Sequence, residues 1–110
     1  PAAIVTNATT SVARRTANAA PEGTFSVVIG NDETTNPKPD PQPYLLAAEL
    51  LGVDPTQCVA LEDSPSGVRS ATAAGMRVIV VPGELEVPAE LGTVRLKHEE
   101  LTLEAVRALA

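Results

Sequence analysis

The sequence contains very few aromatic and sulfur-containing residues. Among its 110 residues there are one Tyr, one Phe, no Trp, one Met and one Cys. A core without large rings has to be built from Ala, Val, Leu and Ile, which favours close packing of helices on a sheet. The single Cys58 excludes an internal disulfide, and the absence of a CxxC pair or Cys/His cluster argues against a zinc site.

Positive charge and long apolar runs are scarce as well. The chain has 8 Lys and Arg against 14 Asp and Glu, which gives a formal net charge of −6. Nucleic acid and anionic membrane both attract basic surfaces, so this charge argues against either as a partner. No run of about 18 apolar residues and no basic-then-apolar signal pattern is present. We therefore expect a cytoplasmic protein.

The length allows one small domain. The first residue is Pro1, and an apolar strand-like run follows almost at once. We therefore expect the chain to be a piece of a longer protein, with residues 1–110 forming part of one domain.

Short apolar runs alternate with segments of helical periodicity, which predicts βα units around a parallel sheet. The runs are rich in β-branched residues and short, as strands buried on both faces usually are. They cover residues 2–6, 25–30, 58–61 and 77–81, with 93–96 as a weaker fifth. Helices are predicted at 9–18 and 103–109, and loops at 31–43 and 82–88. The pattern predicts an α/β fold.

One further helix is predicted from its boundary residues. Asp40 is placed to cap it, Pro41 to occupy its first turn, and Gly52 to follow its last turn. Its apolar side chains recur at i, i+3, i+4 and i+7, which predicts one buried stripe. The stripe consists of Tyr44, Ala47, Ala48 and Leu51.

The same pattern of boundary residues recurs once. Ser64 precedes Pro65, and Gly75 ends the segment. The predicted buried face of this helix consists of Val68, Ala71 and Thr72. Two such units in succession favour a parallel sheet covered by helices.

Ligands of open parallel sheets bind beyond the carboxyl ends of the strands, which selects candidate residues by position. Thr6 and Asn7 follow the first predicted strand, and the loop with Lys38 follows the second. Glu62 and Asp63 follow the third. Adjacent carboxylates suit Mg²⁺, which shares its coordination shell with substrate phosphate, and an ammonium and a hydroxyl suit the remaining phosphate oxygens. Together these residues predict a phosphate site with a metal ion.

Three sequence segments resemble the haloacid dehalogenase superfamily, in particular its phosphoglycolate phosphatase and β-phosphoglucomutase-like branch. The segments are Ile4-Val5-Thr6-Asn7, the Lys38-Pro39-Asp40-Pro41 segment with its following helix, and Glu62-Asp63-Ser64-Pro65-Ser66-Gly67-Val68 running on to Met76. The match extends over essentially the whole chain, and it implies that residues 1–110 are the C-terminal portion of the core domain of such a hydrolase. It implies a three-layer Rossmann-like parallel sheet and a Mg²⁺-dependent phosphatase that acts on a small phosphorylated metabolite.

The resemblance also implies roles for individual residues. Thr6 and Asn7 would contact phosphate, and Lys38 would stabilise the phosphate and the nucleophile, so Thr6 and Lys38 are the catalytic candidates. Asp63 would bind Mg²⁺, with Glu62 as a second ligand or as the partner of a bound water. Gly67 would permit close helix packing.

One element of the family pattern is absent from this sequence. Members of the family carry their nucleophile and general acid/base as an Asp-x-Asp motif after an N-terminal strand, and the sequence contains no such motif. Asp32 and Glu33 lie in the wrong loop and in the wrong order. The family topology puts the nucleophile strand between the strands at 2–6 and 58–61, so we expect a gap in the sheet there. The chain would then lack both this strand and any cap domain, and would need the missing N-terminal segment or a partner strand.

Three other functions fit parts of the sequence. A sugar phosphomutase of the same superfamily uses the same core chemistry, and nothing in the sequence separates it from a phosphatase. A non-catalytic phosphate-binding or interaction module would account for the absent nucleophile. A phosphoacceptor receiver domain is disfavoured because its acidic residues come early and its lysine last, the reverse of the order of Lys38 and Asp63.

Overall fold

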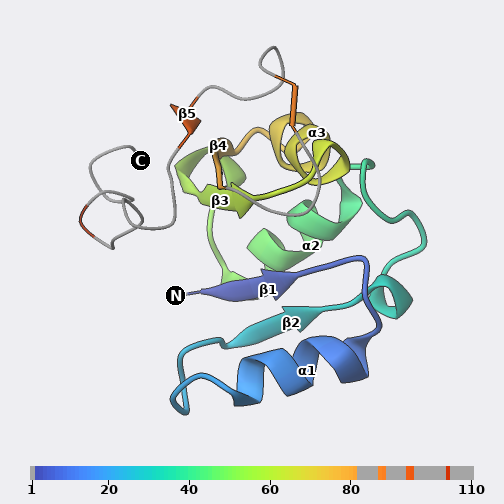
Figure 1. Cartoon of the computed structure of the whole chain (residues 1–110), viewed down its shortest axis with the longest axis vertical. Helices are drawn as coiled ribbons and strands as arrows, with labels where there is room; N and C mark the ends of the chain where they lie inside the picture. Colours follow the sequence, from blue (N-terminus) through green and yellow to red (C-terminus); the bar gives the residue numbers. More distant parts are fainter. Residues whose placement is uncertain (1, 82–86, 89–93, 96–103, 105–110) are drawn as a thin grey trace.

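The structure is a computed structural model that describes residues 2–81, 87, 88, 94, 95 and 104 (Figure 1). Strands and helices alternate along the described chain. In order they are β1 (Ala3–Val5), α1 (Thr10–Asn18), β2 (Val27–Ile29), α2 (Gln42–Leu51), β3 (Val59–Glu62), α3 (Pro65–Ala73), β4 (Arg77–Val80) and β5 (Val94–Arg95). Short 3-10 turns lie at Asn31–Glu33 and Pro55–Gln57. All five predicted strands are confirmed. The helix predicted at 103–109, apart from residue 104, and the loop predicted at 82–88, apart from residues 87 and 88, lie outside the described residues.

Every described strand pair is parallel, which confirms the predicted α/β class. β1 pairs with β2, with Ala3 opposite Val27. β3 pairs with β4, with Val59 opposite Arg77, and β4 pairs with β5. These pairings form two separate sheets, and in the described part of the chain β1 and β3 are not joined to each other. The gap expected between these two strands is therefore present.

The helices cover both strand groups. α1 and α2 both contact β1 and β2, while α3 contacts β3, β4 and α2. Figure 1 shows the β1–β2 pair lying between α1 and α2. The main core cluster consists of Tyr44, Ala60, Val68, Ala71, Ala74, Val78, Val80 and Val87. Apart from the Tyr44 ring these side chains are small and aliphatic, as the composition predicted, so helices and sheet pack closely.

The start of α2 lies one residue later than predicted. The helix begins at Gln42, and Asp40 accepts a hydrogen bond from the Gln42 N–H at 2.9 Å. Pro41 therefore precedes the helix, and the first turn contains Pro43 instead. At the other end Gly52 has a φ of 72°, a left-handed conformation that costs glycine little.

The boundaries of α3 agree with prediction. The Ser64 side chain accepts a hydrogen bond from the Gly67 N–H at 3.1 Å, and Gly75 leaves the helix with a φ of 87°. One predicted core position is wrong, because Thr72 is exposed. The buried stripe runs through Gly67, Val68, Ser70, Ala71 and Ala74, and this leaves position 72 on the outer side of the helix.

Among the described residues, no helix combines the length and the apolar character needed to cross a membrane.

Candidate functional site

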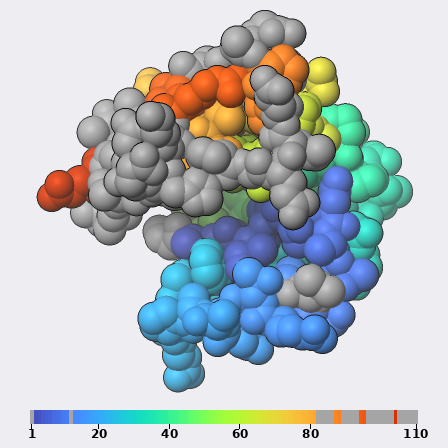
Figure 2. Space-filling model, viewed as in Figure 1, coloured from blue at the N-terminus to red at the C-terminus, as the bar shows by residue number. Residues whose placement is uncertain are grey.

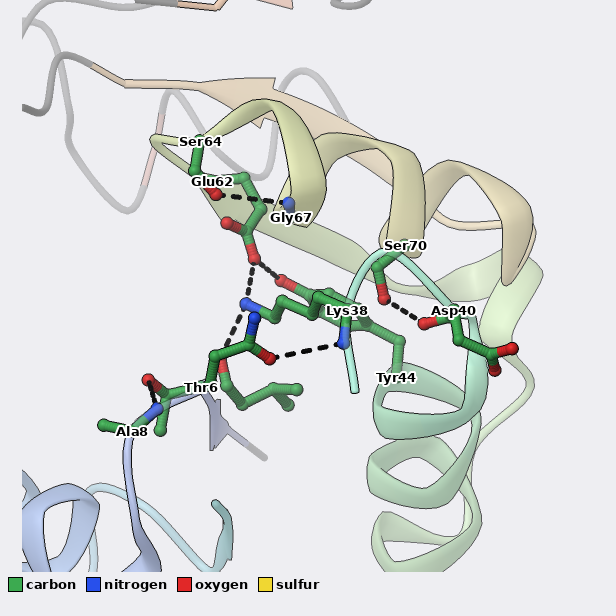
Figure 3. Close-up of polar contacts among 11 residues, drawn as sticks. Thr6, Ala8, Lys38, Asp40, Tyr44, Glu62, Ser64, Gly67 and Ser70 are labelled. Atoms are coloured by element: carbon green, nitrogen blue, oxygen red, sulfur yellow. Dashed lines mark hydrogen bonds and ion pairs between the residues drawn. The ribbon is translucent and has the colours of Figure 1, made fainter. Parts of the chain in front are cut away.

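The carboxyl ends of β1 and β3 meet at the side chain of Lys38 (Figure 3). Lys38 donates from Nζ to the carbonyl oxygen of Val5, the last residue of β1, at 2.9 Å. The same ammonium lies 2.5 Å from Oε2 of Glu62, the last residue of β3. The sequence placed these groups at strand ends, and the structure brings them together.

Lys38 is held from several directions. Its side chain is 8% exposed, and its ammonium lies 5.1 Å from the centre of the Tyr44 ring, within the range of a cation–π contact. Its backbone N–H donates to Oδ1 of Asn7 at 3.2 Å. The loop before α2 is thus fixed to the segment that follows β1, so the position of the ammonium is set by both.

Glu62 is buried, with 5% of its surface exposed. Its Oε2 accepts hydrogen bonds from the Lys38 ammonium and from the Tyr44 hydroxyl. A Cβ at position 67 would overlap this carboxylate, so Gly67 makes room for the Glu62 side chain. The close packing expected at Gly67 is therefore packing against Glu62.

The two acidic residues predicted as metal ligands have different surroundings. Glu62 is engaged with Lys38 and Tyr44, whereas Asp63 is exposed. Over the described residues, His, Cys, Asp and Glu nowhere gather in a group of three that could hold a metal ion. Asp63 offers the hard oxygen that Mg²⁺ prefers, and Mg²⁺ is commonly bound by one or two carboxylates together with water and substrate phosphate. The donor set therefore fits Mg²⁺ only in part, and Asp63 is the candidate carboxylate that is open to solvent.

Thr6 and Asn7 lie directly after β1. The Thr6 hydroxyl accepts a hydrogen bond from the Ala8 N–H at 3.1 Å, and this leaves its own hydrogen available for donation. Asn7 is exposed and uses its side-chain oxygen on Lys38, so its NH₂ group can still donate. Both residues keep a hydrogen-bond donor that a phosphate oxygen could accept from.

Asp32 lies in the same loop as Lys38, between β2 and α2, but close to β2. Its Oδ1 accepts from the backbone N–H of Thr10 at 2.8 Å and from the Thr10 hydroxyl at 2.5 Å. These two hydrogen bonds, the side-chain one first, lower the pKa of the Asp32 carboxyl. A carboxylate at the first turn of a helix is stabilised by the free N–H groups there. Asp32 therefore fixes the start of α1.

Two contributors were missed at the sequence level. The helical pattern predicts Tyr44 only as part of the buried stripe, yet its hydroxyl reaches Glu62. Ser70 is completely buried and donates to the carbonyl oxygen of Asp40 at 2.6 Å, which ties α3 to the loop that follows Lys38. The position of Ser70 on the buried stripe of α3 could have indicated such a contact, because a buried hydroxyl needs a hydrogen-bond partner.

A groove lies between the two strand groups. Its lining combines residues of β1, such as Ile4, with residues of β3, such as Ala60, and with Ala48 of α2. The groove has a volume of about 580 Å³ and is mainly apolar. Figure 2 shows a hollow on this face of the molecule, beside the dark blue N-terminal segment. We call it the β1–β3 groove.

Comparison with known proteins gives one consistent answer. Residues 1–81 match the family described as haloacid dehalogenase-like hydrolase. Hexitol phosphatase A of Escherichia coli is 37% identical over 109 residues, which is 99% of this chain and 48% of that protein. The chain thus spans about half the length of this curated relative.

Solved structures agree with the sequence comparison. A haloacid dehalogenase superfamily hydrolase of subfamily IA from Geobacter sulfurreducens matches with a TM-score of 0.75 and 28% identity, over 98% of this chain and 48% of that one. The protein CbbY from Rhodobacter sphaeroides, in complex with xylulose-(1,5)-bisphosphate, matches with a TM-score of 0.74 and 30% identity. That match covers 92% of this chain and 51% of the CbbY chain.

Proposed function

Because this chain belongs to the haloacid dehalogenase-like hydrolases, we propose that it supplies the phosphate- and magnesium-binding edge of a phosphatase that acts on a small phosphorylated metabolite. The observation that carries the proposal is the meeting of the β1 and β3 ends at Lys38. One cation, one hydroxyl and one exposed carboxylate are gathered there, at the sheet edge where ligands of parallel sheets bind.

Each residue has a distinct task in this proposal. Lys38 neutralises charge on the transferring phosphoryl group, and Thr6 and Asn7 donate hydrogen bonds to its oxygens. Phosphoryl transfer depends mainly on positioning and on charge stabilisation, which these groups provide. Asp63 holds Mg²⁺, which neutralises phosphate charge when it is bound. The solvent exposure of the two side chains fits these tasks, since the Lys38 side chain is nearly buried and Asp63 is exposed.

The attacking carboxylate comes from outside these 110 residues in this proposal. It forms a bond to phosphorus as the ester P–O bond breaks, and the leaving oxygen takes a proton from a general acid. Water then attacks the phosphorus of the aspartyl-phosphate, which releases inorganic phosphate and restores the carboxylate. The chain alone is accordingly proposed to be inactive.

We further propose that an extended strand carrying this carboxylate occupies the β1–β3 groove. Two features support it. β1 pairs only with β2 and β3 only with β4 among the described strands, so each has an edge without a strand partner. The groove between them is apolar, as the surroundings of a central strand must be. A strand there would end beside Lys38.

The proposed function is tested by aryl phosphate hydrolysis in the full-length protein that contains this chain, with and without Mg²⁺. We expect Lys38→Ala to lower turnover by about 10²–10³-fold, because a preorganised charge-stabilising group is lost. Asp63→Asn should lower turnover and raise the Mg²⁺ concentration required. Arg14→Ala on α1 and Glu49→Gln on α2 are the matched charge-removing controls, since both residues are exposed.

Two results would count against the proposal. Unchanged kcat/KM in Lys38→Ala would remove that residue from the reaction. Full activity of Asp63→Asn at the same Mg²⁺ requirement would remove the metal-ligand assignment.

A further inference from the structure

The Glu62 carboxylate is held by two donors that act on the same oxygen. Its Oε2 accepts from the Lys38 ammonium and from the Tyr44 hydroxyl, which come from the loop before α2 and from α2 itself. Its other oxygen, Oε1, is the atom nearest to the position a Cβ would take at Gly67. The carboxylate is therefore confined on one side by donors and on the other by α3.

We propose that Tyr44 is a positioning residue of the phosphate site, because its hydroxyl fixes the Glu62 carboxylate that in turn places the Lys38 ammonium at the end of β1. The inference rests on the proposed function for its catalytic consequence. Its structural part concerns only the contacts among these three side chains (Figure 3).

The tyrosine hydroxyl is suited to this task. The Tyr44 hydroxyl is the donor of this contact, because an ionised carboxylate has only acceptor atoms. A hydrogen bond to an ionised group is stronger than one between neutral groups. Without it, the buried carboxylate would have the Lys38 ammonium as its single donor in the described contacts, which leaves both groups freer to turn.

The ring and the hydroxyl of Tyr44 have separable roles. The ring belongs to the main core cluster and lies beneath the Lys38 ammonium, while the hydroxyl reaches Glu62. A phenylalanine at this position keeps the ring, so Tyr44→Phe removes the contact to Glu62 and preserves the packing. The hydroxyl can therefore be tested alone.

The experiment is a double-mutant cycle with Tyr44→Phe and Glu62→Gln in the full-length protein, measured as kcat/KM for an aryl phosphate. We expect Tyr44→Phe alone to lower kcat/KM about tenfold, as loss of a charge-assisted hydrogen bond implies. The double variant should be no worse than Glu62→Gln, because Tyr44 acts through Glu62. Thr72→Ala, an exposed hydroxyl on α3, is the control for loss of a helix hydroxyl.

A purely structural role of Tyr44 predicts something else. The two substitutions would then reduce kcat/KM independently and their effects would multiply. That outcome overturns the positioning role.

A crystal structure of the full-length Tyr44→Phe protein tests the same inference without any activity. We expect the Lys38 ammonium to lose at least one of its two contacts, to the Val5 carbonyl or to Glu62. An ammonium still within hydrogen-bonding distance of both overturns the inference. If the wild-type protein hydrolyses no phosphate ester, the proposed function fails, and this structure still decides the position of Lys38.

Discussion

The ends of β1 and β3 contribute to the same site but are held in different ways. After β1, Thr6 and Asn7 are partly or fully exposed, and their described side-chain contacts are hydrogen bonds to backbone N–H groups. At the end of β3, Glu62 is buried and bonded to a charged side chain and a hydroxyl. Exposed polar contacts contribute little net stability, while a buried charge depends strongly on its partner. Substitutions at the two ends should therefore differ in effect.

The largest difference is expected at Glu62. Glu62→Ala removes the partner of Lys38, whose side chain is 8% exposed, and leaves a nearly buried ammonium without its carboxylate. We expect the free energy of unfolding of the full-length protein to fall by about 3–5 kcal/mol, measured by urea denaturation. Asp63→Ala, at the adjacent but exposed carboxylate, is the matched control and should change stability by less than about 0.5 kcal/mol. Equal effects of the two would contradict the comparison.

A substitution of Gly67, which packs against Glu62 at the end of β3, should have a smaller effect on stability. Gly67→Ala places a methyl group where the Glu62 carboxylate lies, which should cost about 1–3 kcal/mol of unfolding free energy. The double variant with Glu62→Ala should show less than the sum of the two losses, because the obstructing side chain is gone. Strictly additive losses in thermal or urea unfolding would show that the two residues do not compete for the same space.

Substitutions of Asn7 test how the end of β1 contributes to stability. Asn7→Ala removes the acceptor of the Lys38 N–H, and we expect it to cost about 0.5–1.5 kcal/mol. Asn7→Asp keeps an acceptor, so its stability should stay near that of the wild type, while its added negative charge should weaken phosphate binding. A stability loss in Asn7→Asp equal to that in Asn7→Ala would argue against this contact.

The smallest effect on stability is expected for Asp32→Asn, and it depends on pH. Its pKa is lowered below 3.8 by the Thr10 hydrogen bonds, so its contribution is present above pH 3.8 and is lost as the pH falls through the folded-state pKa. Wild type should therefore be slightly more stable than Asp32→Asn at neutral pH, and the difference should vanish in acid. A difference that does not change between neutral and acidic pH would contradict this role.

Sequence reasoning succeeded where local pattern determines structure. The β-branched runs predicted the strands, and Ser64, Pro65 and Gly75 predicted the limits of α3 because capping chemistry is local. The meeting of Lys38 with the ends of β1 and β3 was predictable too. Parallel strands bring their carboxyl ends to one edge.

Contacts between distant side chains were not predictable in the same way. Tyr44 fits the apolar stripe of α2, and only the packing of α2 near β3 brings its hydroxyl to Glu62. The different surroundings of Glu62 and Asp63 could have been anticipated, because successive side chains at a strand end point to opposite sides.

The most direct test of the central claim compares residues 1–110 alone with a longer protein from the same reading frame that carries an Asp-x-Asp segment upstream. Both are assayed for aryl phosphate hydrolysis with Mg²⁺. We predict activity only in the longer protein, because the proposed function puts the nucleophile on a strand that occupies the β1–β3 groove. Activity of residues 1–110 alone would contradict the account, as would a complete reading frame without such a segment.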